Sequence, residues 1–313
     1  MEIFSLMSVD TWLYLIFLSV LAISLFIDFG VFNKPKEMSY RSAALQSLCW
    51  VCIALSFGAL IYWKEGKEFA LQYVSAYLME YSLSIDNIFV FVLILAYFKV
   101  SSKYYHKVLF YGIIGAVVFR AIFILLGMAL VDQFYWILYI FGIVLIYTGY
   151  KILVSGQEPE VHPDENIVYK FMKKYFNILP EEGDGKFIIY RDGKKFYSIL
   201  FLVVGVLAST DLVFAIDSIP AAFAVSQNKM VVLTSNIFAV MGLRAMFYLL
   251  MGAVNKFDYL QQGISFVLMF IGFKMLIEIV NWHIPTELSL LIIILMLGSS
   301  VIFSLLKNGS SDK

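Results

Sequence analysis

Long runs of apolar residues divide the chain into segments of about the length that crosses a lipid bilayer. A membrane-spanning helix needs about 20 mostly apolar residues. The runs are continuous and do not alternate strictly between apolar and polar positions, which favours helices over the strands of a membrane barrel. The pattern therefore predicts an all-α, polytopic membrane protein with nine transmembrane helices. The nine segments are residues 12–32, 40–62, 69–98, 104–131, 134–154, 197–224, 230–253, 260–280 and 287–306.

The composition agrees with this interpretation. Hydrophobic residues make up 61% of the 313 residues and charged residues 15%, so an ordinary soluble domain with a charged surface is excluded. We expect the lipid bilayer to be the main environment of the protein. The formal net charge is zero and the basic residues are spread over several loops, so no nucleic-acid partner is expected.

The basic residues gather in alternate loops, which indicates how the chain crosses the membrane. Cytoplasmic loops carry an excess of Lys and Arg. The richer loops should therefore face the cytoplasm, which places the N-terminus outside, and the C-terminus and the polar segment 155–196 inside. The richer loops carry Lys34, Lys36 and Arg41, then Lys99, Lys103 and Lys107, then seven Lys or Arg within 155–196, then Lys256, Lys307 and Lys313, whereas the poorer loops carry Lys64, Lys67 and Lys229.

The two halves of the chain contain an internal repeat. Three short matches occur in the same order in both halves, at register shifts of 125, 124 and 123 residues. Each copy contains three spans, an odd number, so the second copy enters the membrane from the opposite side. Such inverted repeats are common in secondary transporters, whose substrate site lies near the middle of the membrane. The matches pair Ser84–Phe89 with Ser209–Phe214, Arg120–Leu126 with Arg244–Leu250, and Gly149–Lys151 with Gly272–Lys274.

These features predict five parts along the chain. The polar part, which contains a short helix-like stretch, joins the two repeats as a cytoplasmic loop. The parts are two peripheral spans in 1–68, the first repeat in 69–154, the cytoplasmic loop in 155–196, the second repeat in 197–280, and the last span with a cytoplasmic tail in 281–313.

Six ionisable side chains lie inside the predicted spans. Each costs at least about 2–3 kcal/mol at the centre of a bilayer, so each indicates a functional site. If all are ionised, the four acids and two arginines leave a formal charge of −2, which would match a divalent cation. The same residues would also fit a set of interhelical ion pairs. They are Glu80, Asp86, Arg120, Asp211, Asp217 and Arg244.

The polar atoms near these acids are oxygens, which suit magnesium, calcium or manganese better than zinc or copper. Pro220 removes a backbone hydrogen bond beside Asp217, which predicts a kink that frees the carbonyl of Ile216 as a ligand. Asn236 either lines the same cavity or makes an interhelical hydrogen bond. Desolvation could also protonate any of the acids and so couple transport to protons. The other side chains that could supply an oxygen ligand to a metal ion are Ser84, Asn87, Ser209 and Ser218.

Cys49 and Cys52 form a CxxC pair inside the second predicted span. In a cytosolic protein this motif can indicate redox chemistry. Residues three apart share a helix face, and a buried cysteine usually behaves as a small apolar residue. We therefore expect packing to explain the pair, and a membrane-bound redox modulator is the alternative function.

No enzyme activity is expected. Two intramembrane aspartates can share a proton as the catalytic pair of an aspartyl protease. The GxGD motif of intramembrane proteases of this kind does not occur around Asp86 or Asp211. The acids therefore point to ion binding instead of catalysis.

The residues around these charges resemble the TerC family of integral membrane proteins. The similarity covers roughly residues 12–280, and its two acidic motif blocks are long and distinctive. The resemblance implies a multi-pass protein of the bacterial inner membrane that exports Mn²⁺ from the cytoplasm, for which we expect alternating access between the two repeats. Some relatives carry the label of redox modulator. The similar stretches are YLMEYSLSIDNIFVFVLIL, GIIGAVVFRAIFILLG, STDLVFAIDSIPAAFAV and SNIFAVMGLRAMFYLL.

The resemblance also implies the members of the ion site. Mn²⁺ would be the transported substrate, with Ca²⁺ or another divalent ion as alternatives, and no prosthetic group is expected. Arg120 and Arg244 would supply counter-charge. One position departs from the family pattern: a glutamate often stands where this chain has Ala208, which bears on affinity or metal preference. The implied ligands are Glu80, Asp86, Asn87, Asp211 and Asp217.

Overall fold

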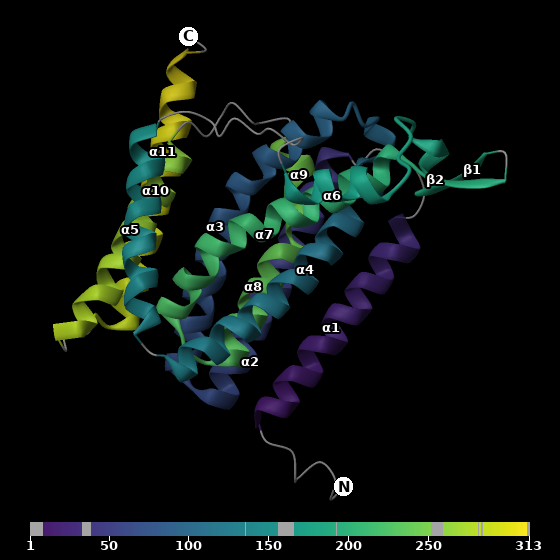
Figure 1. Cartoon of the computed structure of the whole chain (residues 1–313). Coiled ribbons are helices and arrows are strands. Elements are labelled where there is room, and N and C mark those ends of the chain that lie inside the picture. Colours follow the sequence, from purple (N-terminus) through teal and green to yellow (C-terminus); the bar gives the residue numbers. More distant parts are fainter. Residues whose placement is uncertain are drawn as a thin grey trace, which may run out of the picture.

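The protein is a bundle of long helices with a small hairpin at one end (Figure 1). The computed structural model describes residues 9–32, 39–134, 136–155, 166–191, 193–251, 259–280, 282 and 284–311. The side chains of Asp86 and Asp217 lie outside the described part. The bundle helices are α1 (Val9–Phe32), α2 (Tyr40–Glu65), α3 (Lys67–Tyr97), α4 (Ser102–Gln133), α5 (Ile137–Ser155), α7 (Ile199–Val225), α8 (Lys229–Met241), α9 (Leu243–Leu250), α10 (Leu260–Ile277) and α11 (Thr286–Ser311).

Each predicted span coincides with one of these helices, except that 230–253 is divided between α8 and α9. Among the described residues, five helical segments are long and apolar enough to cross a membrane, or six if the two parts of α7 form one span. The described apolar parts of α1 and α10 are shorter than a full span. The all-α, polytopic membrane architecture is therefore confirmed. The five segments are Tyr40–Glu65, Ser102–Gln133, Ile137–Val154, Lys229–Leu250 and Thr286–Ser304.

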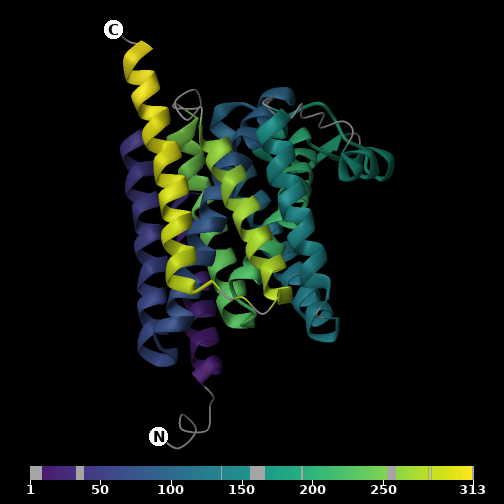
Figure 2. The same cartoon turned by 90° about the vertical axis from the view of Figure 1, so that its left-hand side faces the viewer.

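Helices α3, α4, α7 and α8 form the centre of the bundle (Figures 1 and 2). Helix α4 packs along α7, α3 along α8, and α5 along α10. In an 18-residue stretch across α8 and α9, 94% of the residues are buried, against 17% in a stretch of the same length in α11. Helix α8 is therefore surrounded by protein, whereas α11 turns most of its surface outward, as a lipid-facing helix does.

Glycine allows α4 and α7 to approach closely. A Cβ added to Gly115 would lie 2.7 Å from the Cβ of Ala208, and one added to Gly127 would lie 2.9 Å from the ring of Phe223. These contacts advance in the same direction along both helices, so α4 and α7 run parallel. Small residues at a helix interface are typical of membrane bundles, because they let the backbones come close together.

Helix α7 is bent. Its parts Ile199–Ala215 and Ser218–Val225 meet at 44°. The break lies one turn before Pro220, which cannot donate a hydrogen bond to the carbonyl of Ile216 and clashes with it. The bend therefore occurs where the sequence predicts a kink.

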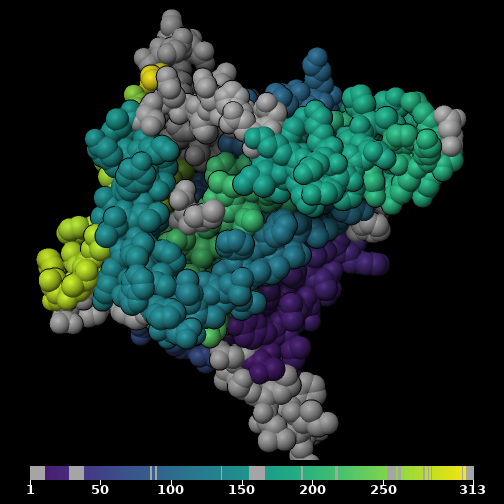
Figure 3. Space-filling model, viewed as in Figure 1, coloured from purple at the N-terminus to yellow at the C-terminus, as the bar shows by residue number. Residues whose placement is uncertain are grey.

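The segment between the two repeats is folded and lies against one end of the bundle (Figures 1 and 3). Its first helix packs on α7, where the sulfur of Met172 lies directly over Gly205. The sequence predicts a loop with a helix-like stretch, and the structure adds a short antiparallel hairpin. The elements are α6 (Ile167–Tyr175), a 3-10 turn (Gly183–Gly185), β1 (Ile188–Arg191) and β2 (Lys194–Tyr197).

Two polar contacts attach this segment to the start of α4. The carboxylate of Glu182 accepts hydrogen bonds from the backbone nitrogen of Ser101 at 2.6 Å and from its hydroxyl at 2.8 Å. The ammonium group of Lys107 donates to the carbonyl of Gly185 at 2.8 Å. A carboxylate at a helix N-terminus also interacts favourably with the helix dipole. The segment is thus fixed to the inner helices at the end where α4 and α7 begin.

Candidate functional site

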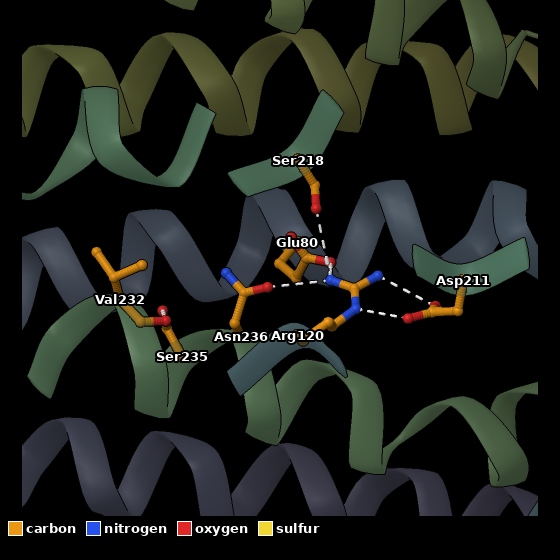
Figure 4. Close-up of polar contacts among 7 residues, drawn as sticks. All are labelled: Glu80, Arg120, Asp211, Ser218, Val232, Ser235 and Asn236. Carbon is orange, nitrogen blue, oxygen red and sulfur yellow. Dashed lines mark hydrogen bonds and ion pairs between the residues drawn. The ribbon is translucent and has the colours of Figure 1, made fainter. Parts of the chain in front are cut away.

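A fully buried arginine on α4, Arg120, lies among the four inner helices. Its Nε donates to Oδ2 of Asp211 at 2.7 Å, and its Nη2 donates to Oδ1 at 3.1 Å (Figure 4). One guanidinium therefore engages both carboxylate oxygens of Asp211. This two-point geometry is among the strongest ways in which arginine binds a carboxylate. It connects α4 to α7 at the middle of the bundle.

The remaining guanidinium nitrogen, Nη1, contacts three further side chains (Figure 4). It forms an ion pair with Glu80 on α3. It donates to Oδ1 of Asn236 on α8 at 3.0 Å and to the hydroxyl of Ser218 on α7 at 3.5 Å. Arg120 thus binds oxygen atoms of side chains on α3, α7 and α8.

This cluster has no contact with solvent. Glu80, Arg120, Asp211 and Asn236 are each 0% exposed. If all three charged groups are ionised, two carboxylates and one guanidinium leave a formal charge of −1. Unpaired charges are expensive in the interior of a protein and in a membrane. The pairing explains how the inner helices tolerate these charges in the present conformation.

Three buried polar atoms in or beside the cluster have no hydrogen-bond partner within the part of the chain that the structure describes. They are Oε2 of Glu80, Oγ of Ser84 and Nδ2 of Asn236. A buried polar atom without a partner costs about 1–3 kcal/mol, and such atoms are few in native proteins. The two oxygens could accept a hydrogen bond or bind a cation, whereas the amide nitrogen could only donate a hydrogen bond.

The spacing of polar residues explains why they meet. Glu80, Ser84 and Asn87 are four and three residues apart on α3, so they share one face of that helix, and all three are buried. Asp211 and Ser218 are seven residues apart on α7, which is about two turns. Glu80 from α3, and Asp211 and Ser218 from α7, contact the long side chain of Arg120, which reaches in from α4.

Two predicted site residues lie elsewhere. The hydroxyl of Ser209 donates to the carbonyl of Val206 at 2.9 Å and to Oδ1 of Asn166 at 3.2 Å, so it faces the segment between the repeats. Arg244 on α9 is 3% exposed, and its guanidinium carbon lies 5.9 Å from the centre of the Phe110 ring. Ser209 thus lies against Asn166, and Arg244 lies beside Phe110.

The structure describes only part of the predicted set of metal ligands. There, no three His, Cys, Asp or Glu side chains are arranged to hold a metal ion. Asp86 and Asp217, two of the predicted ligands, lie outside the described side chains. For Glu80, Asp211 and Arg120 the geometry is that of interhelical ion pairs, the alternative that the sequence also allowed.

Asn166, which precedes α6, is a contact residue that was not predicted from the sequence. Its Oδ1 caps this helix by accepting from the backbone nitrogens of Val168 at 2.8 Å and Tyr169 at 3.3 Å. Its Nδ2 donates to the hydroxyl of Thr210 at 3.5 Å. The segment between the repeats therefore contacts the residues that immediately precede Asp211. An asparagine before an amphipathic stretch is a helix-capping signal, but its contact with α7 depends on the tertiary structure.

A cavity of about 630 Å³ lies at the C-terminal end of α7. Phe223, one of its lining residues, follows Ser218 by five residues, which is about 7.5 Å along a helix. Polar groups line it as well, and one of them, the hydroxyl of Ser226, donates to Oε1 of Gln72 at 2.6 Å. The cavity thus begins about one and a half turns from the cluster, at the opposite end of α7 from the hairpin. Its other polar lining residues include Glu68, Lys274 and Glu287.

The chain matches the integral membrane protein TerC family over residues 65–312. An uncharacterized membrane protein of Myxococcus xanthus is 41% identical over 294 residues, which cover 93% of this chain and 91% of the relative. An uncharacterized membrane protein of Rickettsia felis is 40% identical over 305 residues, which cover 96% and 99%. The "Putative membrane-bound redox modulator Alx" of Escherichia coli K12 is 37% identical over 307 residues, which cover 95% of both chains. No solved structure matches the chain.

The family match includes all the residues of the cluster, from Glu80 on α3 to Asn236 on α8. The relatives extend the similarity over nearly the whole chain, and these two are named as membrane proteins, in agreement with the architecture described above. The buried charges therefore lie in the part of the molecule that matches the family. The chain belongs to the TerC family of integral membrane proteins.

Proposed function

We propose that this protein transports a divalent metal ion, with Mn²⁺ as the first candidate, out of the cytoplasm by alternating access. The observation that carries the proposal is the buried cluster in which Glu80 and Asp211 meet at Arg120. Two carboxylates at one fully buried point of a membrane protein are expensive to maintain, and intramembrane acids usually mark ion pathways. The proposed role is transport, with no catalytic chemistry and no prosthetic group.

The chemistry of the cluster favours a hard cation. The contacts around Arg120 come from carboxylate, amide and hydroxyl oxygens, which suit Mn²⁺, Mg²⁺ or Ca²⁺. The unpartnered Oε2 of Glu80 and Oγ of Ser84 are further oxygen atoms beside it. Asp86, Asn87 and Asp217 follow on α3 and α7 and complete the proposed ligand set.

Reciprocal packing supports an inverted repeat. The first repeat supplies α3, α4 and α5, and the second supplies α7, then α8 with α9, and α10. An inverted repeat that relates α3 to α7 and α4 to α8 would exchange the α3–α8 interface with the α4–α7 interface, and both interfaces are extensive. The cluster lies where these interfaces meet. Alternating access would then move one repeat relative to the other about the ion site.

The surroundings of the cluster suggest two ends of a pathway. The folded segment between the repeats lies at one end of α7, and the polar cavity lies at the other. If the basic loops face the cytoplasm of a bacterial cell, the hairpin covers the inner end and the cavity opens toward the outside. The ion would enter near Asn166 and leave past Phe223.

A redox role is the second candidate, because one relative is named as a membrane-bound redox modulator. Cys49 and Cys52 on α2 are free and exposed, so they are not the buried, packed pair that the sequence led us to expect. If the pair carried the function, replacing both residues by serine would abolish it. If the protein is a transporter, the double variant keeps its full Mn²⁺ export.

An experiment in cells tests the proposal. In a strain that depends on this protein for Mn²⁺ export, Asp211→Asn should raise cellular manganese several-fold and increase sensitivity to added Mn²⁺, because it removes one of the buried carboxylates. Asp132→Asn is the matched control, since this exposed carboxylate pairs with Lys229 at the surface at 2.8 Å. Normal export by Asp211→Asn, at equal amounts of protein in the membrane, would contradict the proposal.

A further inference from the structure

The oxygens that would bind a transported cation are held by the guanidinium of Arg120. Both oxygens of Asp211 accept from it, and its Nη1 engages Glu80 and Oδ1 of Asn236. A divalent ion of this class needs several such oxygens at about 2.0–2.6 Å. A guanidinium and a metal ion cannot occupy the same side of the Asp211 carboxylate at the same time.

We propose that Arg120 is an internal competitor of the transported ion. Its guanidinium takes the place of the cation in this closed conformation and moves away when the ion binds. This inference rests on the proposed function and specifies one step within it. Arg120 is then a coupling residue that acts on the ligands, and it is not a ligand itself.

The charges of the cluster favour exchange over simultaneous binding. Glu80, Asp211 and Arg120 together carry a formal charge of −1, and adding a divalent ion beside them would give +1. If the guanidinium withdraws, the two carboxylates and the ion sum to zero. Like charges within a few ångströms repel strongly where water is excluded. Asp86 and Asp217 lie outside this described set and are not counted in it. Within the set, exchange avoids direct repulsion between the guanidinium and the ion.

The position of Arg120 couples this exchange to movement of the repeats. Arg120 and Glu80 belong to the first repeat, on α4 and α3, whereas Asp211 and Asn236 belong to the second, on α7 and α8. In the closed conformation the guanidinium connects the two repeats through four hydrogen bonds, two to Asp211, one to Asn236 and one to Ser218. When the ion displaces it, this connection is lost and the repeats can shift. Ion binding would thus favour the conformation that lacks the arginine contact.

A purely structural ion pair makes a different prediction. If Arg120 only holds the helices together, its removal weakens folding, ion binding and transport in the same direction. If Arg120 competes with the ion, its removal strengthens ion binding and slows transport. Measuring ion binding and transport together therefore distinguishes a structural role of Arg120 from competition with the ion.

The first experiment measures Mn²⁺ binding and transport by the full-length Arg120→Gln variant. Titration calorimetry with MnCl₂ in detergent should show binding at least about tenfold tighter than in the wild type, a difference of about 1.4 kcal/mol. Mn²⁺ flux in proteoliposomes should fall by at least about the same factor. Arg191→Gln is the matched control, because this exposed arginine of the hairpin pairs with Glu181 at the surface. Unchanged or weaker Mn²⁺ binding by Arg120→Gln, beside measurable binding by the wild type, would overturn the proposal.

A second pair of variants keeps the test decisive if Arg120→Gln does not fold. Glu80→Gln alone leaves Arg120 paired with Asp211, so Mn²⁺ binding should nearly disappear. Adding Arg120→Gln to Glu80→Gln restores the formal charge of −1 and frees Asp211. The double variant should then bind Mn²⁺ at least about tenfold more tightly than Glu80→Gln. A double variant that binds no better than the single one would contradict competition.

If the proposed function is wrong, the binding and transport measurements give a different combination of results. If the folded wild type neither binds nor transports Mn²⁺, Ca²⁺ or Mg²⁺, the transport proposal fails and the competition fails with it. If the wild type binds and transports Mn²⁺ but the arginine variants show no gain in binding, transport stands and only the competition is refuted.

Discussion

At the scale of single residues, the role of a polar side chain depends on where its partner lies. Ser235 and Asn236 are neighbours on α8, and both are fully buried. The hydroxyl of Ser235 donates to the carbonyl of Val232 on its own helix at 3.2 Å, whereas Oδ1 of Asn236 accepts from Arg120 (Figure 4). The serine is satisfied locally, and the asparagine connects α8 to α4. Two equally buried side chains therefore contribute differently to the contacts between helices.

This difference predicts unequal effects on stability. Asn236→Ala should lower the free energy of unfolding by about 1–3 kcal/mol, because it removes a hydrogen bond to a buried charged group. Ser235→Ala should change it by about 0.5 kcal/mol or less. Thermal unfolding of the purified protein in detergent, followed by tryptophan fluorescence, compares the two variants with the wild type. Equal losses in both variants would show that the contact with Arg120 adds nothing.

At the scale of elements, the segment between the repeats is part of the folded molecule. Glu182 fixes it to the start of α4, and Asn166 fixes it to α7 beside Asp211. Helix α6 and the hairpin therefore lie over one end of the two helices that carry the central ion pair (Figures 1 and 3). A change in the relative position of α4 and α7 would also change these contacts.

The attachment through Glu182 can be tested by hydrogen exchange. Glu182→Ala removes the acceptor for the backbone nitrogen and hydroxyl of Ser101. Losing such hydrogen bonds costs about 0.5–1.5 kcal/mol, so amide exchange in the first turn of α4 and in 177–187 should rise by about 2- to 12-fold. Glu181→Ala is the control, because Glu181 makes an exposed ion pair with Arg191 at 3.4 Å. Similar exchange in the two variants would show that Glu182 does not hold the segment.

At the scale of the whole molecule, the sequence predicts the helices well and their contacts poorly. Apolar runs located each bundle helix, because lipid requires long stretches without charge. The rarity of intramembrane charge singled out Glu80, Arg120 and Asp211. Their pairing could not be derived, since Arg120 lies 40 residues from Glu80 and 91 from Asp211, and only the packing of four helices brings them together. The attachment of Asn166 to α7 was missed for the same reason.

The packing of the whole bundle places the charged cluster among α3, α4, α7 and α8, which belong to the two halves of the chain. Helices α3 and α4 contact α8 and α7 around Arg120, while α1, α2 and α11 pack outside this centre. The fully buried acids are the feature that a purely structural role explains least well. The account therefore depends on whether this buried centre conducts a divalent ion.

The most direct test is the flux of Mn²⁺ through purified protein in liposomes. The account predicts saturable Mn²⁺ flux by the wild type and the Asp132→Asn control. It predicts a loss of about tenfold or more in Asp211→Asn, because a charged ligand contributes about 1.5–3 kcal/mol. Flux no greater than in protein-free liposomes, or equal flux in the wild type and Asp211→Asn, would contradict it.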